Sequence, residues 1–270
     1  MKIWKNTSTL NGYDQGLLFT ENKNEVKIIL LGSKPIDLID FPNLKGIFRA
    51  GIGKDNVPEK KASKRGILVR YPSQSTINII FDETASFTCG LIFRMLYHHV
   101  GTIEAWTKYD RTALSAKKLL VIGTGNIGSR VVNFMQPFMR VLTFDILVNE
   151  LSELPDLIGK ADCITLHITK TVDNEAFMDK ERLGLMKDGA IIINTSRGAI
   201  VDEDALYSEV KSGRLEAAFD VFWQEPYNGK LNKFYPNQFF MTPHVASTCS
   251  RFLKGCREGL DLLMQELHHD

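Results

Sequence analysis

The sequence has few cysteines, and none of them form a C-x-x-C pair. Cys89, Cys163, Cys249 and Cys256 are widely separated along the chain, which gives no sign of a disulfide framework. We therefore expect four reduced thiols, no metal site and a cytoplasmic location. The opening residues, MKIWKNTSTLNGYDQ, also lack the apolar core of a secretory signal peptide.

The sequence also lacks long apolar runs and a surplus of charge. No run approaches the ~18 to 20 residues that a membrane span needs, and the stretch GLIFRMLY is interrupted by Arg94. The net charge of +1 gives no electrostatic reason to expect nucleic acid or a membrane surface as a partner. With 270 residues, 44% of them hydrophobic, the chain is long enough for one large or two modest globular domains.

What the sequence does contain is an alternation of short apolar runs with helical patterns. In the first part we expect buried strands at 26–32, 44–53 and 66–72, a short polar helix at 57–66 and an apolar helix at 83–99. From residue 118 onward, six further strands are expected, at 118–123, 140–145, 161–168, 190–196, 216–222 and 238–244. Helices are expected at 126–139, 180–189, 202–213 and 252–267. This order predicts βαβ units in parallel sheets, arranged as two αβ lobes with a crevice between them.

Three glycines with the spacing G-x-G-x-x-G, Gly123, Gly125 and Gly128, follow one expected strand. In a dinucleotide-binding loop the first glycine makes the tight turn, the second lets backbone approach the pyrophosphate, and the third lets the helix pack closely on the strand. Amides at the start of the next helix, including those of Asn126 and Ile127, would then face the phosphates. The glycines alone would equally suit a plain strand-to-helix turn or a methyltransferase loop.

An acidic residue, Asp145, ends the next expected strand, 17 residues after Gly128. This is close to the ~20 residues expected for an acid that binds the ribose hydroxyls of a dinucleotide. A carboxylate at that point repels a 2′-phosphate, so we expect NAD (as NADH in the reductive direction) rather than NADP. Strand, glycines, helix and acid together favour a dinucleotide site over a plain turn.

The sequence has six histidines, the residue type best suited to move a proton near neutral pH. Four lie at a helix end or in the polar tail, where we expect solvated or capping residues: His98, His99, His268 and His269. The other two, His167 and His244, follow the carboxyl ends of expected parallel strands, the edge at which ligands bind in open αβ sheets.

Two charged residues occupy similar positions. Arg197 follows the strand AIIINTS, and Glu225 lies five residues after Asp220 in FDVFWQEP. Arginine can hold a carboxylate with two parallel hydrogen bonds, and a carboxylate beside an imidazole favours its protonated form. Arg197, Glu225 and His244 in one crevice would combine a carboxylate clamp with a general acid, although each alone could have a structural role. The combination suits interconversion of a 2-oxo acid and a 2-hydroxy acid.

Four blocks of the sequence, GTGNIG, LMKDGAIIINTSRGAIVDEDAL, AAFDVFWQEP and TPHVAS, resemble the D-isomer-specific 2-hydroxyacid dehydrogenase family in order and spacing. The resemblance covers nearly the whole chain. It implies an α/β fold, with a doubly wound parallel-sheet NAD-binding Rossmann domain at 81–247. It further implies a smaller flavodoxin-like αβ substrate-binding domain that is discontinuous, at 1–80 and 248–270.

The resemblance also implies residue roles. Arg197 would bind the substrate carboxylate, Glu225 would pair with His244, and His244 would shuttle a proton while hydride moves to or from the nicotinamide. Ile52 and Gly53 would offer their amides to the substrate carboxylate. The residues implied to lie against the cofactor are Gly123, Gly125, Asn126, Ile127, Gly128, Asp145, His167, Thr195, Ser196, Asp220 and His244. His167 is thereby a cofactor-side residue and not a catalytic one.

The segment RAGIGKDNV most resembles the phosphoglycerate dehydrogenase branch of the family. That branch places an arginine for the substrate phosphate where this sequence has Gly32, and Lys34 is the nearest substitute. We therefore keep 3-phosphoglycerate, glyoxylate and hydroxypyruvate as candidate substrates, and a homodimer as the expected assembly. The competing class is a non-catalytic NAD(H)-sensing protein of the corepressor type, which would need none of the three predicted catalytic residues.

Overall fold

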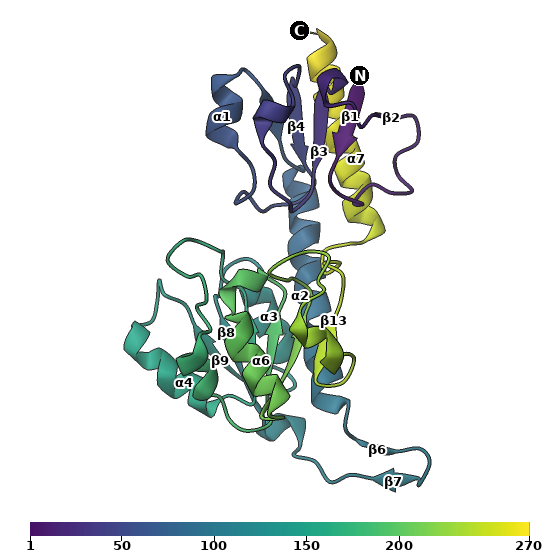
Figure 1. The fold of residues 1–270 in the computed structure, drawn as a ribbon. Coiled ribbons are helices and arrows are strands. Elements are labelled where there is room, and N and C mark those ends of the chain that lie inside the picture. The colour runs from purple at the N-terminus through teal and green to yellow at the C-terminus, as the bar shows by residue number, and fades with distance from the viewer. Residues whose placement is uncertain (270) are drawn as a thin grey trace. The chain divides into compact units, whose positions relative to one another are not determined.

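The computed structural model describes residues 1–269. Asp270, at the end of the predicted C-terminal segment, and the side chain of His269 lie outside the described residues. The chain forms two compact units, Met1–Ile80 with Ser247–Asp270, and Phe81–Ala246. We refer to them as unit 1 and unit 2 (Figure 1).

Unit 1 is built on a five-stranded parallel sheet in the order β2-β1-β3-β4-β5. The strands are β1 (Lys2–Lys5), β2 (Leu18–Phe19), β3 (Ile28–Leu31), β4 (Gly46–Arg49) and β5 (Leu68–Arg70). The order 2-1-3-4-5 is that of flavodoxin-like folds. The apolar runs of β3 and β4 are buried along their whole length, as strands covered on both faces must be.

Helices cover both faces of this sheet. The helix α7 (Ser250–His269) covers one face, because its apolar residues recur every three or four positions; they are Phe252, Cys256, Leu260, Leu263 and Leu267. The short helix α1 (Glu59–Lys64) packs on the other face through Ala62, beside the 3₁₀ turn η2 (Leu38–Asp40). A further 3₁₀ turn, η1 (Lys23–Glu25), precedes β3.

Unit 2 is built on a six-stranded parallel sheet in the order β13-β12-β11-β10-β8-β9. The strands are β8 (Lys118–Ile122), β9 (Arg140–Phe144), β10 (Cys163–Leu166), β11 (Ala190–Asn194), β12 (Leu215–Phe219) and β13 (Phe239–Met241). After β8 the chain forms β9, which pairs with one edge of β8, and then β10, which pairs with the opposite edge of β8. The carboxyl ends of β8 and β10 therefore form the topological switch point, where a doubly wound sheet binds its ligand.

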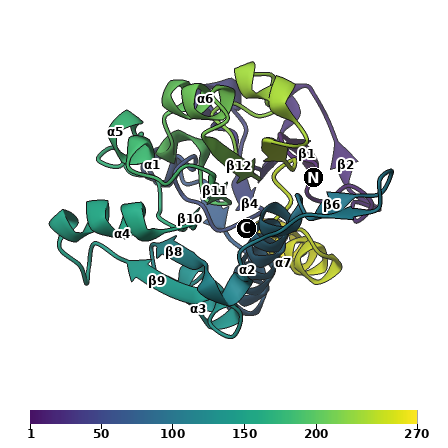
Figure 2. The same cartoon turned by 90° about the horizontal axis from the view of Figure 1, so that it is seen from below.

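The helices of unit 2 lie on both faces of its sheet (Figure 2). On one face pack α2 (Gln74–Tyr97), whose first residues belong to unit 1, and α3 (Gly128–Met135). On the other face pack α4 (Leu154–Lys160), α5 (Lys180–Gly184) and α6 (Glu203–Lys211). The smaller elements are the hairpin β6 (Gly101–Thr102) and β7 (Thr107–Lys108), and 3₁₀ turns at Leu114–Ala116, Leu151–Glu153, Gly198–Ile200 and Lys230–Phe234. The predicted α/β fold class, with one Rossmann-like sheet, is confirmed.

Several element boundaries differ from the sequence-based expectation. Helix α2 begins at Gln74, well before residue 83, and Ser73 stabilises its first turn by accepting a hydrogen bond from the amide of Thr76. Helix α3 ends at Met135, because Pro137 cannot continue the helical hydrogen bonds. The strand β1 and the helix α4 were not expected at all. Among the described residues, no helix is long and apolar enough to cross a membrane, and the four cysteines are free.

The buried ring of Phe48 provides a test of the unit 1 core. It lies at 0% exposure between the sheet and α7, where a Cβ on Gly259 would come within 2.6 Å of its Cε2 atom. We expect Phe48→Ala to lower the free energy of unfolding by about 3–5 kcal/mol, because the truncation leaves a cavity. Urea unfolding followed by circular dichroism measures this change. Ile39→Ala is the control, since Ile39 is 80% exposed, and an equal loss in both variants would contradict this packing.

Candidate active site

The glycine loop after β8 is shaped by close backbone contacts. Gly123 has φ +90°, and a Cβ there would lie 2.8 Å from the carbonyl oxygen of His167 at the end of β10. A Cβ on Gly128 would lie 1.9 Å from the carbonyl oxygen of Gly123. Both positions therefore exclude a side chain, for the two reasons that a dinucleotide loop requires: a tight turn and close helix–strand packing.

The middle glycine of the loop faces open space instead. A Cβ on Gly125 would meet nothing within 4 Å, so no contact within the protein explains a glycine at this position. Within residues 1–269, no described hydrogen bond is donated by the amides of Asn126, Ile127 or Gly128. Free amides at a helix start, beside backbone with space in front of it, fit a dinucleotide diphosphate.

Asp145, at the end of β9, is held against the glycine loop. Its Oδ2 accepts hydrogen bonds from the amide of Thr124 at 2.8 Å and from its hydroxyl at 2.9 Å, and Oδ1 accepts from the amide of Leu147 at 3.1 Å. These bonds, the one from the Thr124 amide above all, hold the pKa of Asp145 below its usual value. The carboxylate is thus ionised at neutral pH, and its remaining lone pairs can accept hydroxyl groups of a ribose.

His167 follows β10 at the same switch point. Its amide donates to the carbonyl of Ile122 at 2.8 Å, and its Nε2 lies 3.0 Å from the hydroxyl of Thr165. Burial lowers the pKa of His167 to about 3, because the surrounding protein disfavours the imidazolium form. A ring that is neutral at pH 7 is a poor proton donor, and contact of His167 with a cofactor stays a prediction.

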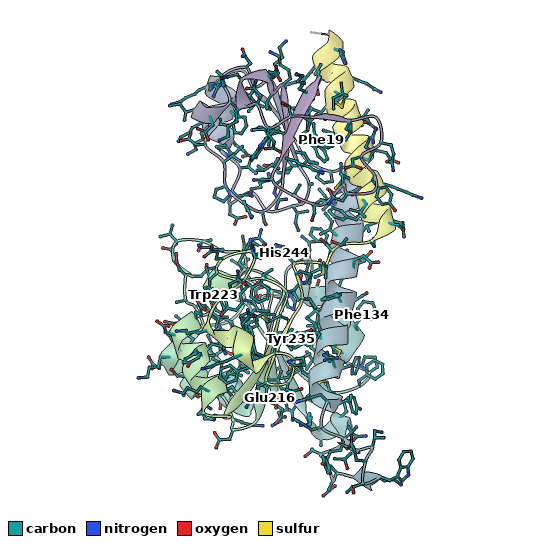
Figure 3. All side chains as sticks on the ribbon, turned by 45° about the vertical axis from the view of Figure 1, so that its right-hand side comes forward. Phe19, Phe134, Glu216, Trp223, Tyr235 and His244 are labelled. Carbon is teal, nitrogen blue, oxygen red and sulfur yellow. The ribbon has the colours of Figure 1, made fainter. Side chains whose placement is uncertain are left out.

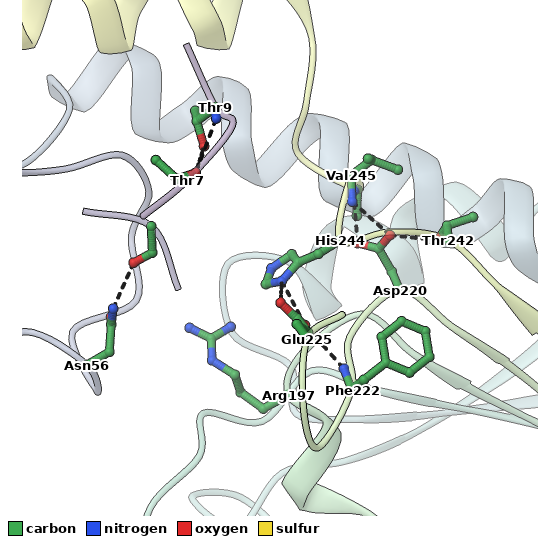
Figure 4. A network of polar contacts seen from close by, with 12 residues as sticks. Thr7, Thr9, Asn56, Arg197, Asp220, Phe222, Glu225, Thr242, His244 and Val245 are labelled. Atoms are coloured by element: carbon green, nitrogen blue, oxygen red, sulfur yellow. Dashed lines mark hydrogen bonds and ion pairs between the residues drawn. The ribbon is translucent and has the colours of Figure 1, made fainter. Parts of the chain in front are cut away.

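His244 and Glu225 form a pair at the carboxyl edge of the same sheet (Figure 4). Nδ1 of His244 lies 2.9 and 3.0 Å from the two carboxylate oxygens of Glu225. Glu225 is fixed in turn, because its Oε1 accepts a hydrogen bond from the amide of Phe222 at 3.2 Å. The carboxylate therefore holds the proton on Nδ1 and leaves Nε2 as the reactive nitrogen. The side chain of His244 is 34% exposed.

The carboxylate of Asp220 organises the segment that carries His244. Its Oδ1 accepts from the hydroxyl of Thr242 at 2.6 Å and from the amide of Val245 at 2.8 Å, while Oδ2 accepts from the amide of Ala246 at 2.9 Å. Asp220 is fully buried, and burial raises its pKa despite these bonds. They bracket His244, whose backbone has φ +55°, an unusual conformation for a residue other than glycine. Contact of Asp220 with a cofactor stays a prediction.

Arg197 follows β11, and its position depends on the glycine beside it. A Cβ on Gly198 would lie 2.1 Å from the carbonyl carbon of Phe222, so the two loops touch backbone to backbone. The indole Nε1 of Trp223 donates to the carbonyl of Val201 at 2.6 Å, which also holds these two loops together. Figure 4 shows the guanidinium of Arg197 next to the pair formed by Glu225 and His244. Three residues predicted to be catalytic thus come together in unit 2.

The other predicted residues of this edge have internal partners. The hydroxyl of Thr195 pairs with that of Thr88 on α2 at 2.8 Å, and Ser196 donates from its amide and its hydroxyl to the side chain of Asn194. These contacts fix the turn after β11. Whether Thr195 and Ser196 also contact a cofactor stays a prediction.

In unit 1, Arg49 organises the loop that contains Ile52 and Gly53, the residues predicted to offer amides to a carboxylate. This role of Arg49 was not predicted from the sequence. Arg49 is buried, and its guanidinium donates to the carbonyls of Ala50 at 2.9 Å and Gly53 at 3.1 Å. With those carbonyls engaged, the loop that contains Ile52 keeps a fixed shape. The sequence feature that could have revealed this role is an arginine at the end of an otherwise apolar strand.

The family model for the D-isomer specific 2-hydroxyacid dehydrogenase NAD-binding domain matches residues 95–246. The chain belongs to the D-isomer specific 2-hydroxyacid dehydrogenase family. It is 34% identical to a hydroxypyruvate reductase of Thermotoga maritima, over 82% of this chain and 76% of that protein. It is 33% identical to a D-3-phosphoglycerate dehydrogenase of Mycobacterium leprae, over 77% of this chain but only 42% of that longer protein.

Two solved structures share the fold of the chain. A D-lactate dehydrogenase from Aquifex aeolicus, complexed with NAD and lactic acid, superposes with a TM-score of 0.79 at 24% identity, covering 100% of this chain and 96% of that one. A phosphoglycerate oxidoreductase from Vibrio cholerae gives a TM-score of 0.81 at 21% identity, with full coverage of both chains. At such identities the likeness establishes the architecture, and the chemistry rests on the residues themselves.

Gly125 offers a test of the dinucleotide loop. We expect Gly125→Ala to weaken NADH binding about tenfold or more, because the added methyl group would occupy the space of the diphosphate. Titration of NADH fluorescence measures the affinity. The variant should fold normally, since its Cβ meets nothing within 4 Å, and Gly184→Ala is a matched control with the same open surroundings. Unchanged NADH affinity in Gly125→Ala would place the diphosphate elsewhere.

Proposed function

We propose that this member of the family is an NAD-dependent oxidoreductase that interconverts a small 2-oxo acid and its D-2-hydroxy acid. When bound, the nicotinamide supplies or accepts the hydride. The observation that carries the proposal is the pairing of His244 with Glu225 beside Arg197, on the edge of the sheet where the glycine loop and Asp145 also lie.

In the proposed reaction His244 moves the proton. Its Nε2 donates to the carbonyl oxygen of the substrate as a hydroxyl group forms, and takes the proton back in the reverse direction. Glu225 keeps the ring in one tautomer and stabilises the imidazolium form. No other histidine of unit 2 combines a partly exposed side chain with a carboxylate at this edge in the part of the chain that the structure describes.

Arg197 is proposed to hold the substrate carboxylate. Two parallel N–H donors fix both carboxylate oxygens, and so orient the carbonyl carbon for hydride transfer. In unit 1, Ile52 and Gly53, on the loop that Arg49 braces, are proposed to offer their amides to a substrate carboxylate.

The end of β3 favours an unphosphorylated substrate. The position at which the phosphoglycerate-like branch has its arginine is Gly32, and a Cβ there would lie 2.6 Å from the Cβ of Thr7. The backbone of Gly32 is also enclosed, since its amide donates to Asn6 and its carbonyl accepts from Asn56, both at 2.7 Å. We therefore propose glyoxylate or hydroxypyruvate ahead of a phosphorylated acid.

A cytoplasmic location and a homodimer stay predictions. The hairpin of β6 and β7 supports association with a second copy, because Ile103 and Trp106 are more than three-quarters exposed, at 77% and 78%.

Two substitutions test the proposed roles. We expect His244→Ala to lower kcat by about 10²–10⁴-fold, because the general acid is lost. We expect Arg197→Lys mainly to raise KM, because a lysine keeps the charge but cannot form the two parallel bonds. Both are measured as NADH oxidation with glyoxylate, hydroxypyruvate and phosphohydroxypyruvate.

His268→Ala and Arg251→Ala serve as matched controls for these variants, since both residues are exposed. Normal rates in His244→Ala and Arg197→Lys would refute the assigned roles. Saturable NADH binding without turnover of any 2-oxo acid would instead favour the sensor alternative. A preference for phosphohydroxypyruvate would overturn the substrate proposal alone.

Asp145 is proposed to select NADH over NADPH. Its pKa lies below the usual value, so at neutral pH the charge repels a 2′-phosphate. We expect Asp145→Asn to lower the ratio of kcat/KM with NADH to kcat/KM with NADPH by about tenfold or more, because the carboxylate no longer repels the 2′-phosphate of NADPH. Steady-state kinetics with both cofactors checks this, and an unchanged ratio would show that selectivity resides elsewhere.

A further inference from the structure

A second cluster of polar groups lies at the other end of unit 2. His98 and His99 follow the last turn of α2, and Glu216 is the second residue of β12. Glu216 points to the face of the sheet on which Ala218 and Ile191 pack in an apolar core. A carboxylate in such surroundings needs a cationic partner. The two histidines provide its contacts.

The histidines differ from their expected description as solvated or capping residues. The side chain of His98 is only 19% exposed, because it turns inward toward Glu216, whereas His99 is 67% exposed. His98 does cap the helix, with its Nδ1 lying 2.5 Å from the carbonyl oxygen of Met95. Since a carbonyl can only accept, Nδ1 must carry the proton.

The capping bond has a consequence for the other ring nitrogen of His98. With the proton on Nδ1, the neutral ring has a lone pair on Nε2. This atom is buried and makes no hydrogen bond with any described residue, although Oε2 of Glu216 lies 3.2 Å away. A lone pair therefore faces a carboxylate oxygen, and this arrangement is repulsive unless a positive charge lies between the two atoms.

We propose that His98, His99 and Glu216 form a binding site for a zinc ion. The three ligand atoms all lie within 4.8 Å of one another, and Nε2 of His99 is 3.8 Å from Oε1 of Glu216. Zinc binds imidazole nitrogen and carboxylate oxygen at about 2.0–2.2 Å in tetrahedral geometry, which separates two ligand atoms by about 3.3–3.5 Å. The distances from the carboxylate of Glu216 to Nε2 of His98 and of His99, 3.2 and 3.8 Å, lie on either side of this separation.

The chemistry of the cluster favours zinc over harder ions. Two imidazoles and one carboxylate suit zinc, whereas magnesium and calcium require mostly oxygen ligands. The bond from Nδ1 of His98 to the carbonyl of Met95 is the type of outer contact that orients metal-bound histidines. The exposed ring of His99 gives the ion a path of entry. Three protein ligands leave a fourth position for water.

The site is separate from the candidate active site. Glu216 lies near the start of β12, and Asp220 follows the end of the same strand. Figure 3 accordingly shows Glu216 and His244 at different ends of unit 2. The zinc site thus does not depend on the proposed dehydrogenase function, and would stabilise the junction of α2 with the sheet.

Calorimetric titration of the tag-free, metal-stripped full chain with Zn²⁺ tests the proposal. We expect one saturable site per chain. Glu216→Gln and His99→Ala should each weaken binding at least about tenfold, while His268→Ala binds as the parent does. Since His99 is exposed, its substitution should leave the fold intact, which circular dichroism checks.

Three results would overturn the site. The first is no saturable binding, which leaves a simple imidazolium–carboxylate pair. The second is binding that His99→Ala and Glu216→Gln do not change. The third is binding abolished by His244→Asn instead, which would assign the ion to the pair of His244 and Glu225.

Discussion

The candidate active site depends on the way the buried carboxylate of Asp220 holds the segment from Thr242 to Ala246. Two amides and one hydroxyl converge on its two oxygens, and these bonds offset the cost of burying a carboxylate. The histidine between them can therefore adopt a backbone conformation that would be unfavourable elsewhere. Without this anchor, neither the backbone of His244 nor the contact with Glu225 would be fixed. The chemistry proposed for the imidazole thus rests on a group that need not touch the substrate.

Topology supplies the rest of the site. Because all six strands of the large sheet of unit 2 are parallel, the residues that follow them gather at a single edge, although they are far apart in the sequence. Gly123, His167, Arg197, Asp220 and His244 each follow a different strand. A parallel sheet thus turns a periodic sequence pattern into a spatial cluster.

This explains why much of the fold could be predicted from the sequence. The apolar runs and the glycine spacing determine the strands of unit 2 and the loop after β8, and both follow from local periodicity. Arg197, Glu225 and His244 could be grouped because each follows an expected strand by a few residues.

What local pattern could not show were contacts between distant segments. The contacts of Arg49 with its loop and the early start of α2 depend on hydrogen bonds of individual side chains, which the spacing of apolar residues in the sequence does not indicate. The burial of His98 was missed because a histidine at a helix end is normally solvated, and only β12 brings Glu216 beside it. The hydrogen bonds of Asp220 to Thr242, Val245 and Ala246 were likewise not predicted, and its contact with a cofactor stays a prediction.

The backbone contact at Gly198 has a consequence for how this enzyme can diverge. The loops after β11 and β12 approach so closely there that any larger residue would collide with the Phe222 carbonyl group. Because Arg197 follows β11 and Glu225 follows β12, lengthening either loop would separate the guanidinium from the carboxylate that pairs with His244. Differences in substrate range among relatives are therefore expected to arise from residues away from this junction.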